Sequence, residues 1–182
     1  MVHFVYGGRN FDFVGPEERD YIYSKIEESG SFYEIELLEY IGKIIPRGDK
    51  RGKVCIDVGA NIGNHTIFFA NFLCQKVYSF EPNGDIFGVL SENVRRNAEN
   101  VTLSPFALGR REGGGRISLP VEGQGNTGMA RVLEGDGSGE VEITTLDRFV
   151  ADRLEGEDVS FIKIDVEGME ELWELVREGA RI

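Results

Sequence analysis

From residue 53 onward, short apolar runs alternate with stretches of helical periodicity, and this alternation constrains the fold more than any other feature. Short apolar strands that are separated by helices are typical of a parallel sheet with helices on both faces. We therefore expect an α/β fold whose ligands bind at the carboxyl ends of the strands. Strands are predicted at 53–58, 76–80, 101–108 and 159–165, and helices at 62–73, 85–98 and 169–178.

The N-terminal segment is predicted to form a hairpin and two helices. Val2–Tyr6 and residues 10–14 are β-type runs on either side of a glycine pair. A helix is expected over 16–29, because the proline at its start suits a first helical turn. Ser31 and Glu34 have the spacing of a capping box, which predicts that the second helix begins there.

A glycine-rich stretch, 109–139, lies between the third and fourth predicted strands. The β-type residues 117–119 and Val141–Thr144 are expected to pair across it as an antiparallel excursion. Thr145 is then predicted to open a short helix that ends at Leu154.

Length and charge limit the class of protein. A chain of 182 residues argues for a single domain, with an N-terminal part at 1–50 and an α/β core at 53–180. Acidic residues outnumber basic ones by 32 to 20, which gives a net charge of −12. A field of that sign repels phosphate backbones, and acidic residues follow both adjacent arginine pairs, Arg95–Arg96 and Arg110–Arg111. We therefore expect no nucleic-acid partner.

Two further features concern the compartment. No apolar run reaches 18 residues, so no membrane span is predicted, and the start lacks the layout of a signal peptide. Cys55 and Cys74 lie in apolar surroundings without the spacing of a metal site or a disulfide framework. We expect both cysteines to be reduced core residues of a cytoplasmic protein.

The run DVGANIG, from Asp57 to Gly63, follows a predicted strand directly and leads into a helix. Glycines at such a turn let the backbone approach a ligand, and free amides at a helix start can bind an anion. The spacing is not the G-x-G-x-x-G of dinucleotide-binding proteins, which argues against a nicotinamide cofactor. A ligand-binding turn and a tight turn without a ligand are both open at this point.

Glu81 follows the second predicted strand, 18 residues after Gly63. An acidic residue at this point of a doubly wound sheet can accept hydrogen bonds from both hydroxyls of a ribose. The alternative is a solvated charge before Pro82. Together with the glycine turn, Glu81 favours a nucleoside ligand with an unmodified ribose.

Five ordered motifs extend over most of the chain: DVGANIGNHTIFFA, VYSFEPN, ENVTLSPFALG, TTLDRFV and FIKIDVEGMEELWELVREGA. Together they resemble the FkbM family of S-adenosylmethionine-dependent methyltransferases, over about residues 31–180. The resemblance implies the class I methyltransferase fold, S-adenosylmethionine as cofactor, and methyl transfer to a hydroxyl of a glycan or a small-molecule, polyketide-type acceptor. A cofactor-binding protein without turnover and a nucleic-acid methyltransferase are the alternatives, and the net charge disfavours the second.

The resemblance also implies roles for the residues of the glycine turn. Gly59, Asn61 and Gly63 match the turn that lines the methionine end of the cofactor. Asp57 and Ala60 are expected to contact the cofactor with them.

Two further positions follow from the resemblance. Glu81 matches the position that binds the ribose. After the third strand, where many class I enzymes hold the adenine amine with a polar side chain, this chain has Phe106, Ala107 and Leu108. We therefore expect backbone groups and apolar packing to hold the adenine, with Ala107 as a contact.

Asp165 and Glu167 follow the fourth predicted strand, next to the expected ligand site. Methyl transfer to an alcohol is assisted by a base, and one of these carboxylates is expected to remove the proton. The alternatives are that Glu167 caps the next helix and that His65, expected in the site wall, is the base. No histidine or third acid is adjacent in sequence, so no metal site is predicted.

The fourth strand is expected to be an edge of the sheet. The class I fold has strands in the order 3-2-1-4-5-7-6, and only the first four are predicted here. Yet Phe161 and Ile162 place apolar side chains on both faces, as in a buried strand. Three explanations are open: a piece of a longer protein, which we favour, a homodimer that pairs across the edge, or coverage by the N-terminal elements.

Overall fold

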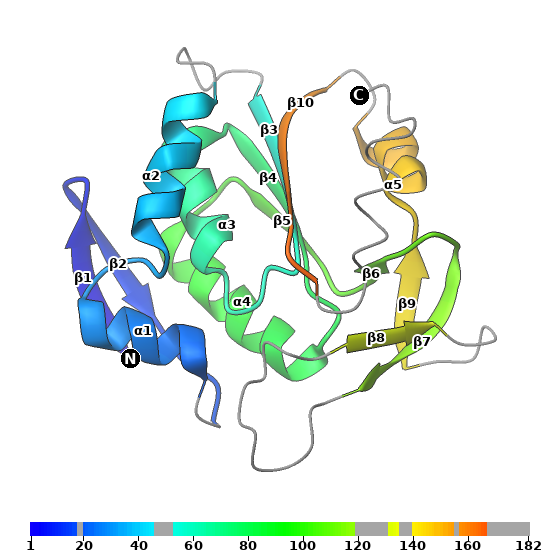
Figure 1. The fold of residues 1–182 in the computed structure, drawn as a ribbon, viewed down its shortest axis with the longest axis horizontal. Helices are drawn as coiled ribbons and strands as arrows, with labels where there is room; N and C mark the ends of the chain where they lie inside the picture. The colour runs from blue at the N-terminus through cyan, green and yellow to red at the C-terminus, as the bar shows by residue number, and fades with distance from the viewer. Residues whose placement is uncertain (18–19, 46–52, 119–130, 135–139, 155–156, 167–182) are drawn as a thin grey trace.

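The computed structural model describes residues 1–17, 20–45, 53–118, 131–134, 140–154 and 157–166 (Figure 1). Its centre is a parallel sheet in the order β10-β3-β4-β5, which agrees with the order that the resemblance implies for its first four strands. The strand predictions at 53–58 and 76–80 are confirmed. The strands are β3 (Lys53–Val58), β4 (Lys76–Phe80), β5 (Val101–Ser104) and β10 (Asp158–Ile164).

Helices cover both faces of this sheet, as the alternation predicts. A buried cluster on one face includes Ile41, Phe69 and Leu90, and a cluster on the other joins Ile56 to Phe149. None of the described helices is long and apolar enough to cross a membrane. In Figure 1, α2 (Ile35–Ile44), α3 (Asn64–Phe68) and α4 (Gly84–Asn97) lie on one side and α5 (Leu146–Arg153) on the other.

Side-chain caps decide where several helices begin. The Asn83 side chain accepts a hydrogen bond from the Asp85 amide at the start of α4, and Thr145 caps α5, where a helix start was predicted. Helix α1 (Tyr21–Ser29) ends at Gly30 as expected, but its predicted start at residue 16 is wrong. The buried Asp20 carboxylate accepts the Tyr23 amide at 2.7 Å, so the helix begins after Asp20.

The predicted helix over 62–73 is divided into α3 and a π-helical turn, η1 (Phe69–Leu73). It begins later than expected because Gly63, at φ 93°, belongs to the preceding turn. The predicted helix at 169–178 lies outside the described residues.

The predicted third strand over 101–108 is wrong as one element. It is β5 in the parallel sheet and β6 (Ala107–Leu108) in a second sheet, separated at Pro105, which has no amide to donate to a ladder. The second sheet has the order β6-β9-β7-β8.

The antiparallel excursion is confirmed with a different register. Strand β7 (Gly113–Ser118) pairs with β9 (Val141–Thr144) through its glycines, Gly113 opposite Ile143 and Gly115 opposite Val141. The rest of β7, which was expected to pair there, instead pairs with β8 (Arg131–Glu134), a strand that was not predicted.

The predicted N-terminal hairpin is confirmed as β1 (Val2–Tyr6) and β2 (Arg9–Phe13), joined by two glycines with positive φ. It packs against α4, where the Asn93 and Asn97 side chains bond the β2 segment's backbone. The hairpin therefore lies beside the helical layer rather than along β10.

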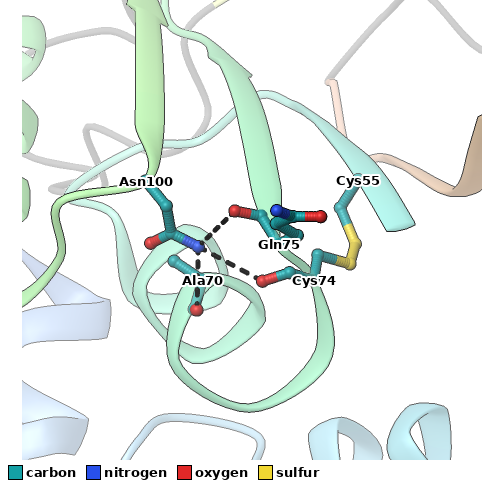
Figure 2. Close-up of a disulfide and its surroundings, with 5 residues drawn as sticks. All are labelled: Cys55, Ala70, Cys74, Gln75 and Asn100. Carbon is teal, nitrogen blue, oxygen red and sulfur yellow. Dashed lines mark hydrogen bonds between the residues drawn. A yellow bond between two sulfur atoms is a disulfide. The ribbon is translucent and has the colours of Figure 1, made fainter. Parts of the chain in front are cut away.

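Cys55 and Cys74 form a disulfide, so the expectation of two reduced thiols is wrong (Figure 2). The crossover from β3 to β4 brings their Cα atoms to 6.0 Å across 19 residues, a convergence that the sequence spacing does not reveal. Beside it, the Asn100 side-chain amide donates to the carbonyls of Ala70, Cys74 and Gln75 at 2.9–3.2 Å. The cysteines thus give no support for a reducing, cytoplasmic compartment.

Candidate functional site

A cavity of about 320 Å³ lies at the carboxyl ends of the parallel strands. Gly59 follows β3, Glu81 follows β4, Phe106 follows β5 and Asp165 follows β10, and all four line this cavity. Residues that sequence reasoning associated with the ligand thus meet at this edge of the sheet, and the binding of a ligand there stays a prediction.

The glycine turn adopts a conformation that only a few residue types accept. Gly59 and Gly63 have φ of 76° and 93°, and Asn61, at φ 49°, is one of the two non-glycine residues with positive φ in the described chain. A Cβ atom on Gly59 would collide with the backbone carbonyl of Asp165, and one on Gly63 would lie 2.8 Å from Leu90 Cδ1. Both glycines are therefore required for backbone and helix packing, whatever binds beside them.

No amide within this turn is free, because all five amides of residues 59–63 already donate, and the anion site expected at the helix start stays a prediction. The amides of Gly59 and Ala60 both donate to the Phe80 carbonyl at 3.0 Å. The next three donate to the Glu81 carboxylate, the Asn61 side chain and the Ala60 carbonyl. The turn is thus tied to the end of β4 and offers a ligand a shaped wall rather than free amides.

Glu81 is buried in the pocket wall, with 9% of its surface exposed. Its two carboxylate oxygens each accept one backbone amide, Oε2 from Asn61 at 3.0 Å and Oε1 from Asn83 at 2.9 Å. Burial raises the pKa of this carboxyl, and the hydrogen bonds from Asn83 and Asn61 counteract part of the effect. Each oxygen keeps a further lone pair, so the carboxylate is held in place and can accept more hydrogen bonds.

One end of the cavity, which we name the apolar end, is lined by Phe106, Ala107, Leu108, Ile117 and Val132. Ala107 is buried in β6, which pairs with β9, so its backbone is held by the second sheet. This end is apolar, which suits a planar ring system.

Asp57, which was predicted to contact the cofactor, lies beneath the turn and is fully buried. Its Oδ2 accepts the Thr66 hydroxyl at 2.6 Å, and its Oδ1 lies 3.0 Å from Lys163 Nζ. Lys163 Nζ also donates to the Gly59 carbonyl at 2.7 Å. Asp57 thus supports the turn through Lys163, a residue that sequence reasoning missed, although a lone charge in an apolar strand was the available signal.

The opposite end of the cavity, which we name the charged end, is lined by Glu34, His65, Lys163 and Asp165. The predicted capping box is wrong, because Glu34 is itself the N-cap of α2 and makes no side-chain cap bond. Its φ of 55° is left-handed, and its Oε2 lies 3.4 Å from His65 Nε2. The neighbouring His65 lowers the pKa of Glu34 against an opposing effect of burial, and Lys163 adds to the lowering.

The loop that carries Glu34 is fixed by a pair of hydrogen bonds that connect residues 31 positions apart. The Tyr33 amide donates to Asn64 Oδ1 and Asn64 Nδ2 donates to the Tyr33 carbonyl, both at 2.9 Å. His65 follows directly and is buried in the pocket wall, as expected.

The two carboxylates that were expected to act in catalysis are Asp165 and Glu167. Asp165 lines the charged end with 73% of its side chain exposed, and its Oδ2 lies 3.7 Å from Lys163 Nζ. Glu167 lies outside the described residues. Among the residues that the structure describes, no three histidine, cysteine or acidic side chains are grouped as metal ligands.

Comparison with solved structures gives partial alignments. An rRNA methylase from Streptococcus thermophilus is 22% identical, with 40% of this chain and 41% of that chain covered and a TM-score of 0.34. M. jannaschii TYW2 in complex with AdoMet is 22% identical, with 56% and 41% covered and a TM-score of 0.35. SMU.1697c from Streptococcus mutans, in complex with SAH, is 19% identical, with 52% and 57% covered and a TM-score of 0.35.

These alignments extend over about two fifths to under three fifths of each solved chain, so they do not assign a substrate. A search of curated proteins finds no significant match. The family model of the methyltransferase FkbM domain, in contrast, matches residues 57–172, which is more than half of the sequence. The chain therefore belongs to the FkbM family of S-adenosylmethionine-dependent methyltransferases, as its motifs indicated.

Proposed function

We propose that this chain catalyses methyl transfer from S-adenosylmethionine to a hydroxyl oxygen of a glycan or of a small-molecule, polyketide-type acceptor. The observation that carries the proposal is Glu81, a carboxylate held by two backbone amides in the wall of a pocket at the strand ends. Such a carboxylate is positioned to accept hydrogen bonds from the two hydroxyls of a ribose.

The pocket residues fit the cofactor in order along the sheet edge. The adenine would pack at the apolar end, with Ala107 as a contact, and the ribose would bond to Glu81. The methionine part would then pass along Gly59, Ala60, Asn61 and Gly63. Of these four, Gly59, Ala60 and Asn61 line the cavity, and Gly63 shapes the turn.

When bound, S-adenosylmethionine would supply a methyl group on a sulfonium sulfur, and the methyl carbon is the atom open to in-line attack by an oxygen nucleophile. The contribution of the protein is to orient the acceptor hydroxyl and to receive its proton. Asp165 is exposed at the charged end and can accept that proton, and Glu167 is the second candidate from the sequence. Lys163 Nζ lies 3.7 Å from the Asp165 carboxylate.

Ligand binding tests the cofactor half of the proposal. S-adenosylhomocysteine at 100 times its dissociation constant should stabilise the fold by about 2.7 kcal/mol, and NAD at the same concentration should not. A melting temperature that S-adenosylhomocysteine leaves unchanged would contradict the proposal.

Turnover separates an enzyme from a protein that only binds the cofactor. We expect a screen of sugars, hydroxylated small molecules and RNA with labelled methyl donor to label a hydroxyl compound and not RNA, since the net charge is −12. With an acceptor in hand, Asp165→Asn should keep cofactor affinity and lose about 10²–10⁴ in rate if Asp165 is the base. If the rate of Asp165→Asn did not change, Asp165 would not be the base, and Glu167 and His65 would remain as candidates.

A further inference from the structure

The strand order gives the ligand a direction along the pocket. Phe106, Glu81, Gly59 and Asp165 follow β5, β4, β3 and β10, so they lie in this order along the sheet edge. With the adenine at the apolar end and the ribose at Glu81, the rest of the cofactor extends toward β3 and β10. Its amino-acid end, which carries an α-ammonium and a carboxylate, therefore reaches the charged end.

Two acceptors at the glycine turn already face a cation. The Gly59 carbonyl and the Asp57 carboxylate both face the Lys163 ammonium, at 2.7 and 3.0 Å. Among the described residues, the carboxylates that line this end and can still receive an ammonium group are Glu34 and Asp165.

Of these two carboxylates, Glu34 is the one that the fold holds in position. Its left-handed backbone is one that non-glycine residues rarely adopt, and its side chain does not cap α2. The Tyr33–Asn64 hydrogen bonds fix the loop, and His65 Nε2 lies 3.4 Å from the carboxylate. Asp165, by comparison, leaves 73% of its side chain in solvent.

We infer that Glu34 binds the α-ammonium group at the amino-acid end of the cofactor. This inference rests on the proposed function, because it takes the ligand to be S-adenosylmethionine. The lowered pKa of Glu34, caused first by the neighbouring His65, keeps its carboxylate ionised at neutral pH. A residue outside the strand–turn–helix motif thus adds recognition of an amino acid to a nucleoside site.

The test compares two ligands that differ by one group. Calorimetry measures the affinity of two ligands, S-adenosylhomocysteine and its analogue with hydrogen in place of the α-amino group. Both are titrated into the full chain and into the variants Glu34→Gln and Glu36→Gln. Glu36 is the matched control, because it lies in the first turn of α2, is exposed and does not line the cavity. Melting curves establish that each variant is folded, and Glu34→Asp, which keeps the charge and shortens the reach, provides a second variant.

We expect the unaltered chain and Glu36→Gln to prefer S-adenosylhomocysteine over the analogue by roughly tenfold or more. Glu34→Gln should bind both ligands about equally, because its affinity for S-adenosylhomocysteine should be roughly tenfold lower than that of the unaltered chain. The affinity of Glu34→Asp for S-adenosylhomocysteine should lie between those two values. Unaltered S-adenosylhomocysteine affinity in Glu34→Gln would overturn the inference, as would an equal loss for both ligands. If that variant kept the affinity and lost methyl transfer, Glu34 would act on the acceptor instead.

The proposed function fails separately from this inference. If the unaltered chain does not bind S-adenosylhomocysteine, the cofactor assignment itself is wrong. If it binds that ligand and does not distinguish the analogue, the cofactor assignment stands and the role of Glu34 is wrong.

Discussion

The apolar end and the charged end of the cavity are built in different ways. Residues at the apolar end, such as Phe106 and Ala107, follow β5 directly and are held by the second sheet. At the charged end, Glu34, His65 and Lys163 come from a loop, a helix and the last described strand. The first end is held by backbone pairing within a sheet, whereas the second depends on side-chain hydrogen bonds and ion pairs between separate elements, so substitutions should affect the two ends differently.

The largest effect is expected at Gly59, which joins the two ends. In Gly59→Ala, the new Cβ would meet the Asp165 backbone carbonyl, and a φ of 76° strains any L-residue. We expect a loss of about 3–5 kcal/mol in the free energy of unfolding. Thermal and urea unfolding, followed by circular dichroism, measure this loss.

Gly88→Ala is the matched control for that substitution. Gly88 lies inside α4, and a Cβ added there would meet no atom within 4 Å, so alanine should raise stability by up to about 1 kcal/mol. Equal melting temperatures for Gly59→Ala and the unaltered chain would show that Asp165 can move away from the turn.

The second effect concerns the charged end alone. Lys163→Met leaves Asp57, which is fully buried, without its cation at 3.0 Å. Removing one partner of a buried pair costs about 3 kcal/mol or more, so urea unfolding should show a loss of that size. Lys43→Met, at an exposed position near the end of α2, should change stability by less than about 0.5 kcal/mol.

A double variant tests the cause of that loss. Asp57→Asn combined with Lys163→Met removes both charges and should recover part of the stability. A double variant no more stable than Lys163→Met would indicate that the lysine acts mainly through the Gly59 carbonyl.

The third effect concerns the middle of the pocket, where Glu81 lies between the two ends. Glu81→Gln places its amide NH2 against the backbone amide of either Asn61 or Asn83 and loses the charge-assisted acceptor. We expect S-adenosylhomocysteine and 5′-methylthioadenosine to bind about 10–100-fold more weakly, because both carry the ribose. Calorimetry that finds unchanged affinity would remove Glu81 from the ribose site.

The raised pKa of Glu81 gives this prediction a pH dependence. Ribose hydroxyls donate to the ionised carboxylate, so binding should weaken as the pH falls through the pKa of Glu81. Because burial raises that pKa, the weakening should begin at a higher pH than for an ordinary glutamate of pKa 4.5. Glu81→Gln should lack this part of the pH profile.

The parts of this molecule that sequence could predict are those with local signals. Strand β3, the turn at Gly59 and Glu81 after β4 follow from apolar runs and from the rule that ligands bind at strand ends. The caps at Asn83 and Thr145 are local in the same sense, because each bonds an amide two or three residues ahead.

The parts that sequence could not predict depend on contacts between distant residues. Ser31 and Glu34 have the spacing of a capping box, but the bonds between Tyr33 and Asn64 place Glu34 in the pocket instead. The disulfide of Cys55 likewise depends on how the crossover closes. In both places a local pattern was overridden by tertiary packing.

The smallest effect is expected from Asn64→Ala, which breaks the link between the loop of Glu34 and α3. Two hydrogen bonds to the Tyr33 backbone are lost, while the apolar end and Glu81 are untouched. We expect roughly threefold weaker binding of S-adenosylhomocysteine and unchanged binding of 5′-methylthioadenosine, which lacks the amino-acid end. Calorimetry with both ligands measures the ratio.

Asn100→Ala separates this effect from a general loss of stability. Asn100 also bonds backbone carbonyls, at the end of η1 beside the disulfide and outside the cavity lining (Figure 2). Its removal should lower the melting temperature and leave the ratio of the two affinities unchanged. If Asn64→Ala weakened the binding of both ligands equally, the two ends would be mechanically coupled, and the contrast between an end held by backbone pairing and an end held by side-chain contacts would no longer hold.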